Sequence, residues 1–83
     1  MLDLSSPYYK TKDLQIASIL VTSGFNIVKL ERSGKICFFI FKNTFDLKNA
    51  LIDYWNGALR VDPKLLFIAY RELKNRIFDN AYE

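Results

Sequence analysis

The sequence predicts a small single α+β domain in the order α-β-β-α-α, with a two-stranded antiparallel hairpin packed on three helices. Three observations predict this fold class. First, the chain has 83 residues, 51% hydrophobic and 16% aromatic, which suits one folded domain and excludes a disordered or low-complexity chain. Second, residues 25–42 are rich in Phe, Ile and Val, which favour strands. Third, the segments on either side carry apolar residues at helical spacing, with capping residues at their ends.

The chain is predicted to begin with a flexible N-terminal arm over residues 1–10, followed by the single domain over residues 11–80. Thr11 has a hydroxyl group that can serve as the N-cap of the first helix. This helix is expected to end at Gly24, because glycine takes the left-handed conformation that a Schellman end requires. Phe25 then packs back on the last turn of the helix.

The next segment is predicted to be a hairpin with Ser33-Gly34 as its two-residue turn. This turn places Leu30 opposite Cys37 and Val28 opposite Phe39. The register gives one clearly apolar face, formed by Val28, Leu30, Cys37, Phe39 and Phe41. It gives a second, mixed face, formed by Ile27, Lys29, Glu31, Ile36, Phe38 and Ile40.

Two more helices are predicted to follow the hairpin. Asn43 or Thr44 is suited to cap the second helix, and Asn56-Gly57 ends it. The third helix opens at Asp62-Pro63, because aspartate is a good N-cap and proline fits the first helical position. It is expected to fray near Asn80.

The residue types that most often carry catalysis are scarce in this chain. There is no His and only one Cys, and we find no Cys-x-x-Cys, glycine-rich phosphate loop or Gly-x-Ser-x-Gly motif. Cys37 lies in the middle of a predicted strand, so we interpret it as an inert core residue. Asp46 and Asp53 share one helix face without a third ligand. We therefore expect that the protein is not an enzyme and that it has no cofactor and no metal site.

A cytoplasmic protein is predicted from the cysteine count and the hydropathy pattern. A single cysteine allows no intrachain disulfide, and the longest apolar run, residues 36–41, is far below the roughly 20 residues of a membrane span. The first residues lack the basic region and the apolar stretch of a signal peptide.

The charge pattern favours nucleic-acid binding as the first functional hypothesis. The formal net charge is +3, and residues 25–44 alone carry four cations against Glu31. A β-ribbon can enter a major groove, and aromatic residues on a sheet can stack on unpaired bases. The third helix adds cations along one side. The competing interpretation is that lysines only solubilise the hairpin and protect its edges. The candidate nucleic-acid contacts are Lys29, Arg32, Lys35, Lys64, Arg71 and Lys74.

The second hypothesis is protein–protein association, because three helices can cover one face of a hairpin but not both. The candidate partner-binding residues are Ile27, Ile36, Phe38 and Ile40. Two hairpins joined around a two-fold axis would give a homodimer with a four-stranded sheet. In the alternative, the first helix covers this face and the domain is a monomer.

Several short runs resemble a known family. They are Asn56-Gly57-x-x-x-Val61-Asp62-Pro63, Arg71-Glu72-Leu73-Lys74-x-Arg76, and the stretch from Thr11-x-Asp13-Leu14 to Ser23-Gly24-Phe25. Over about residues 8–78 the chain resembles a family of short uncharacterised prokaryotic and phage-associated proteins, known only as a domain of unknown function. The resemblance implies a stand-alone small α+β domain, carried by phages or other mobile elements, and brings no active site or ligand.

Overall fold

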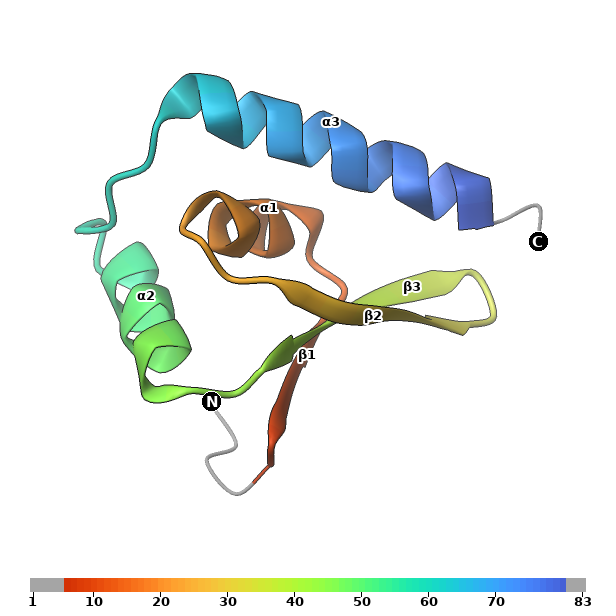
Figure 1. The fold of residues 1–83 in the computed structure, drawn as a ribbon, viewed down its shortest axis with the longest axis horizontal. Helices are drawn as coiled ribbons and strands as arrows, with labels where there is room; N and C mark the ends of the chain where they lie inside the picture. Colours follow the sequence, from red (N-terminus) through yellow and green to blue (C-terminus); the bar gives the residue numbers. More distant parts are fainter. Residues whose placement is uncertain (1–5, 81–83) are drawn as a thin grey trace.

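The computed structural model describes residues 6–80, the side chains of residues 79 and 80 excepted, and confirms a small α+β fold. The elements are β1 (Tyr8–Thr11), α1 (Leu14–Thr22), β2 (Ile27–Ser33), β3 (Ile36–Lys42), α2 (Phe45–Trp55) and α3 (Pro63–Asn80). The strands form one antiparallel sheet in the order β1-β3-β2. All three helices lie on one side of this sheet, with α1 between the sheet and the N-terminal half of α3 (Figure 1). The prediction of a two-stranded hairpin was therefore wrong by one strand.

The additional strand is β1, at residues that the sequence assigned to a flexible arm. Tyr9 lies opposite Phe41 and packs against the core, and burial raises the pKa of its hydroxyl. Asn43 anchors the start of the strand, since its backbone N–H donates to the Pro7 carbonyl at 3.0 Å and its Nδ2 donates to the Ser6 carbonyl at 2.9 Å. Residues 1–5 of the predicted arm lie outside the described residues.

The hairpin turn lies one residue later than predicted, at Gly34-Lys35. Ser33 pairs with Ile36, so Leu30 lies opposite Phe39 rather than Cys37. Gly34 has φ +62°, and no residue other than glycine has a positive φ among the described residues. A turn with positive φ only at its first central residue is of the type II′ kind, which takes glycine there, whereas the predicted placement put serine at that position.

A β-bulge corrects the predicted faces at the start of β2. The register shifts between Ile27 and Lys29, which leaves Val28 unpaired and 49% exposed. Ile27 consequently lies opposite Phe41 and packs on the core, the reverse of the predicted placement. Beyond the bulge the predicted faces hold, because moving the turn by one residue keeps the same residues on each side of the ribbon.

The helix ends follow the predicted capping chemistry, with one exception. Thr44 caps α2 by accepting from the backbone N–H of Leu47 at 3.2 Å, and Asp62 caps α3 by accepting from that of Lys64 at 2.8 Å. The N-cap of α1 is Asp13 rather than Thr11, because Thr11 is the last residue of β1.

The Schellman end predicted for α1 is confirmed. The backbone N–H of Phe25 donates to the Leu20 carbonyl, and that of Gly24 to the Val21 carbonyl, both at 3.0 Å. Gly24 has φ +103°, a conformation that glycine reaches without steric penalty. Phe25 is half-buried and packs against the core cluster that contains Leu20.

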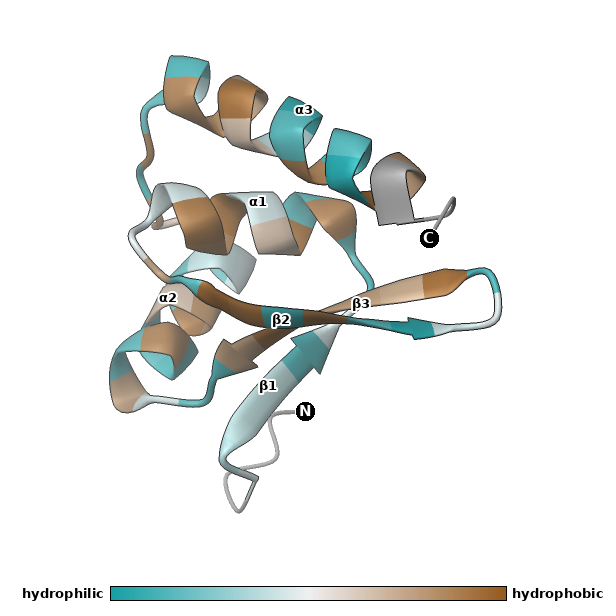
Figure 2. Ribbon diagram, turned by 45° about the vertical axis from the view of Figure 1, so that its right-hand side comes forward, coloured by the Kyte–Doolittle hydropathy of each residue, from teal (hydrophilic) through white to brown (hydrophobic). Residues whose placement is uncertain are grey.

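The core lies between the sheet and the helices, with β3 as its central strand. Figure 2 shows β3 as mostly hydrophobic and β1 as mostly hydrophilic, as expected for a central and an edge strand. Cys37 is buried, as predicted. No helix among residues 6–80 is long and apolar enough to cross a membrane. The core cluster consists of Ile16, Ala17, Leu20, Phe39, Phe41, Leu47, Ala50, Leu51 and Leu73.

Candidate nucleic-acid interface

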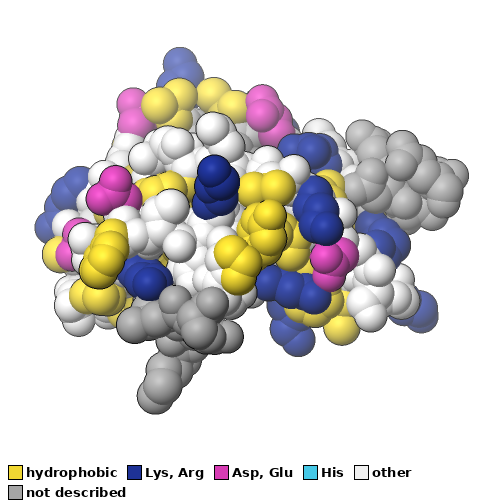
Figure 3. All heavy atoms as spheres, turned by 60° about the horizontal axis from the view of Figure 1, so that its bottom comes forward, with side chains coloured by type: hydrophobic (Ala, Val, Ile, Leu, Met, Phe, Trp, Pro, Cys, Tyr) yellow, Lys and Arg dark blue, Asp and Glu magenta, His cyan; other side chains and the backbone are white. Residues whose placement is uncertain are grey.

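The side of the sheet turned away from the helices, here called the outer face, is the candidate site. No helix of the described residues covers it (Figure 1). The strand register places alternate residues of each strand on this side. Figure 3 shows this side of the molecule, where apolar side chains lie among cations and acidic side chains. The outer face consists of Tyr8, Lys10, Lys29, Glu31, Ser33, Ile36, Phe38, Ile40 and Lys42.

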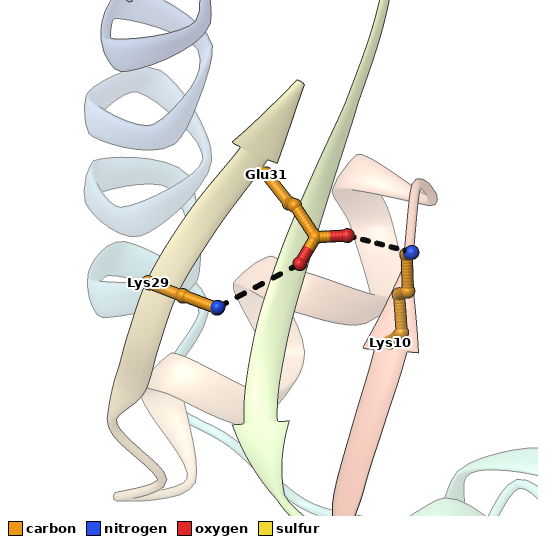
Figure 4. Close-up of polar contacts among 3 residues, drawn as sticks. All are labelled: Lys10, Lys29 and Glu31. Carbon is orange, nitrogen blue, oxygen red and sulfur yellow. Dashed lines mark hydrogen bonds and ion pairs between the residues drawn. The ribbon is translucent and has the colours of Figure 1, made fainter. Parts of the chain in front are cut away.

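Two ion pairs that share Glu31 cross the middle of the outer face, one with Lys10 and one with Lys29. Lys10 Nζ on β1 donates to Glu31 Oε1 on β2 at 2.7 Å, reaching over the central strand β3. Lys29 Nζ lies 3.8 Å from the other carboxylate oxygen of Glu31. Figure 4 shows both lysines pointing toward this one carboxylate. The three side chains are about half exposed, so solvent screens their attraction.

Lys10 also contacts the aromatic ring at the centre of the face. Its Nζ lies 4.6 Å from the centroid of the Phe38 ring, within the range of a cation–π interaction. Phe38 is half-buried, and it lies directly opposite Glu31 in the β2–β3 register. A cation, an anion and a ring therefore occupy one small area of the face.

The electrostatics of this area favour the ionised form of Glu31. The hydrogen bond from Lys10, its positive charge and the more distant Lys29 lower the pKa of the Glu31 carboxyl. Lys42 lies on the same face opposite Tyr8. Among the strand residues of the outer face, Glu31 is thus one anion against the three lysines Lys10, Lys29 and Lys42.

The predicted nucleic-acid contacts do not form one surface. Lys29 lies on the outer face and Lys35 in the hairpin turn, and both are exposed. Arg32 lies on the opposite side of β2, where its Nη2 donates to the Ile77 carbonyl of α3 at 2.8 Å. The other three, Lys64, Arg71 and Lys74, are exposed on α3, which lies on the helical side of the sheet (Figure 1).

The predicted partner-binding residues are also divided. Ile27 packs on the core, and Ile40 is only 3% exposed although the register places it on the outer face. Its cross-strand neighbours are Lys10 and Lys29, whose long aliphatic stems can cover apolar surface. Ile36, at 42% exposed, and the half-buried Phe38 remain accessible there.

Sequence reasoning missed the residues that β1 and the end of β3 bring to the face. Tyr8, Lys10 and Lys42 are all exposed there, yet none was among the candidate contacts. The two tyrosines and Thr11, residue types that favour strands, are the signal that could have identified β1.

Another surface feature lies on the helical side of the molecule. It is an apolar groove of about 380 Å³ between α1, α2 and α3. It offers hydroxyl and amide groups but no charged side chain. No cluster of potential metal ligands occurs among the residues that the structure describes. The groove is lined by Gln15, Ser18, Ile19, Tyr54, Leu66, Phe67 and Tyr70.

Comparison with known proteins places the chain in a family. The family model described as Domain of unknown function (DUF5659) matches residues 6–79, which span β1 to the last turn of α3. Neither the curated proteins nor the solved structures include a match to the chain. Since the family model covers nearly the whole sequence, the chain belongs to the DUF5659 family.

Proposed function

We propose that the protein is a non-catalytic nucleic-acid-binding module that uses the outer face of its sheet. The observation that carries the proposal is the position of Lys10 against the accessible ring of Phe38, with Lys29 and Lys42 on the same face, which no described helix covers. Lysines neutralise backbone phosphates, and an aromatic ring on a sheet offers a surface on which a base can stack.

The proposal gives different roles to the cations that the sequence grouped together. Lys29 and Lys35 remain proposed nucleic-acid contacts, and the proposal adds Lys10 and Lys42 to them. Arg32 is engaged with the C-terminal half of α3. The α3 cations Lys64, Arg71 and Lys74 are exposed on the helix side of the molecule and serve as an internal comparison for the experiment below.

Association through an apolar sheet face is less well supported than nucleic-acid binding. Two of its four candidate residues, Ile27 and Ile40, have little surface to offer a partner. The homodimer, the cytoplasmic location and the association with prokaryotes and phages remain predictions from the sequence.

The direct test is fluorescence anisotropy with labelled oligonucleotides over a range of salt concentrations. We expect binding that weakens as salt rises, and Lys29→Gln/Lys42→Gln to weaken it at low salt. The double substitution should also reduce the slope of log K against log salt by roughly 0.7 per lost contact with a single strand. The matched control is Lys64→Gln/Lys74→Gln, which removes the same charge from α3.

Two results would contradict the proposal. One is the absence of binding at low salt up to about 100 µM protein, the weak end of non-specific binding. The other is an equal loss in both double variants, which would indicate an effect of net charge without a defined interface.

A further inference from the structure

Resting on the proposed function, we infer that the ligand of the outer face is a single-stranded polynucleotide that displaces Glu31. In the complex, a backbone phosphate occupies the place of the Glu31 carboxylate between Lys10 and Lys29, and an unpaired base stacks on Phe38. The free protein thus satisfies its own binding site with an internal anion.

The shape of the face favours unpaired over paired nucleic acid. A major groove admits a helix or a two-stranded ribbon. Here the accessible ring belongs to Phe38 on β3, the central strand of the sheet, where it lies opposite Glu31 of β2 and one residue beyond the pairing with β1. A ring on the central strand of a three-stranded sheet cannot reach base edges inside a groove. A base must leave the duplex stack to meet it, as in other sheet surfaces that bind single strands.

The geometry around Glu31 resembles that of a bound phosphate. Two ammonium groups from different strands converge on its two oxygens, at 2.7 and 3.8 Å. A phosphate is likewise an anion with several acceptor oxygens, and lysine binds it as a point charge. Because both lysines already face one anion, a phosphate can use them fully only after the Glu31 carboxylate has moved away.

The same exchange exposes the stacking surface. Lys10 Nζ, held by Glu31, lies 4.6 Å from the Phe38 ring centroid and occupies the place of a stacked base. Once Glu31 releases Lys10, the ammonium can follow the phosphate and the ring becomes available. Glu31 is therefore a positioning residue that opposes binding, and removing its charge should strengthen binding.

The experiment compares wild type with Glu31→Gln, using a labelled oligothymidine of about 15 nucleotides, near the upper site size of single-strand-binding folds. A duplex of the same length is titrated in parallel. We expect the single strand to bind more tightly than the duplex. We also expect Glu31→Gln to bind it about two- to fivefold more tightly than wild type, as befits an exposed ion pair. Glu72→Gln, an exposed acid on α3, is the matched control and should leave the affinity nearly unchanged.

A second variant tests whether a base stacks on the Phe38 ring. Phe38→Leu keeps an apolar side chain over the sheet and removes the ring, so it should weaken the single strand by at least about fivefold. Thermal unfolding checks that this variant remains folded, and Phe38→Ile, which also lacks the ring and suits a strand, replaces it if it does not.

The outcomes separate this inference from the proposed function. Duplex binding as tight as single-strand binding overturns the inference and leaves nucleic-acid binding intact. The same holds if Glu31→Gln binds no more tightly than wild type, or if Glu72→Gln strengthens binding equally. If the protein binds neither the single strand nor the duplex, the proposed function itself is overturned.

Discussion

At the scale of single residues, Glu31 determines how the outer face behaves. Lys10 and Lys29 lie on the two strands that flank β3, and both are cross-strand neighbours of Ile40. The Glu31 carboxylate lies within reach of both ammonium groups and offsets their repulsion. Exposed ion pairs add little to stability, so we assign Glu31 mainly an electrostatic effect on ligands.

The lowered pKa of Glu31 gives a prediction about pH. Replacing Lys10 with Met should raise this pKa toward the ordinary glutamate value, because the hydrogen bond and charge that favour the ionised form are lost. In the wild type, the ion pair contributes its stability above the ordinary carboxyl pKa and loses it as the pH falls through the lowered value. An NMR titration of the Glu31 side chain measures both variants. An unchanged pKa in Lys10→Met would contradict the described contact, and Lys29→Met should give the smaller shift.

At the scale of elements, the fold depends on short signals that set where each helix ends. In the last turn of α1, Ser23 keeps helical backbone angles and Gly24 has φ +103°. A Cβ placed on Gly24 would meet no atom within 4 Å, so only the backbone conformation opposes a side chain there. The Ser23 hydroxyl is buried without a hydrogen-bond partner among the described residues.

These two neighbours should respond in opposite ways to alanine. Gly24→Ala should destabilise the protein by about 1–2 kcal/mol, the cost of a left-handed conformation for an L-residue. Ser23→Ala removes an unsatisfied buried hydroxyl at helical backbone angles, so it should be neutral or stabilising. Urea unfolding of both variants measures the difference. Equal losses would show that the Schellman end does not impose its geometry on the chain.

The same elements explain what sequence reasoning could and could not find. Asp62-Pro63, Thr44 and Gly24 act on backbone groups a few residues away, so their local pattern was sufficient to place the helix ends. Strand β1 and the bulge at Val28 arise from pairing with β3, more than ten residues away in sequence, and a local pattern does not report such pairing.

The same difference between local and long-range signals decided which residues of the candidate site could be predicted. Lys29, Lys35 and Phe38 could be predicted because they belong to the hairpin itself. Lys10 reached the site only through β1, whereas strand alternation places Arg32 on the other side of β2, where it bonds to Ile77 of α3. The turn lies one residue later than predicted, but this error did not change the predicted faces, because alternate residues stayed on the same side of the ribbon.

At the scale of the whole molecule, the layers separate two basic regions. The sheet presents Lys10, Lys29 and Lys42 on its outer face, whereas α3 and its cations belong to the helical side of the sheet (Figure 1). The net charge of +3 is therefore less informative than its distribution, which provides a defined face with an accessible ring at its centre.

The most direct test of this account is an NMR titration of ¹⁵N-labelled protein with oligothymidine. The account predicts that the largest shift changes fall on backbone amides of the outer face, at Lys10, Lys29, Glu31 and Phe38, while α3 changes little. Shift changes centred on Lys64 and Arg71, or on the apolar groove around Leu66 and Tyr70, would contradict it.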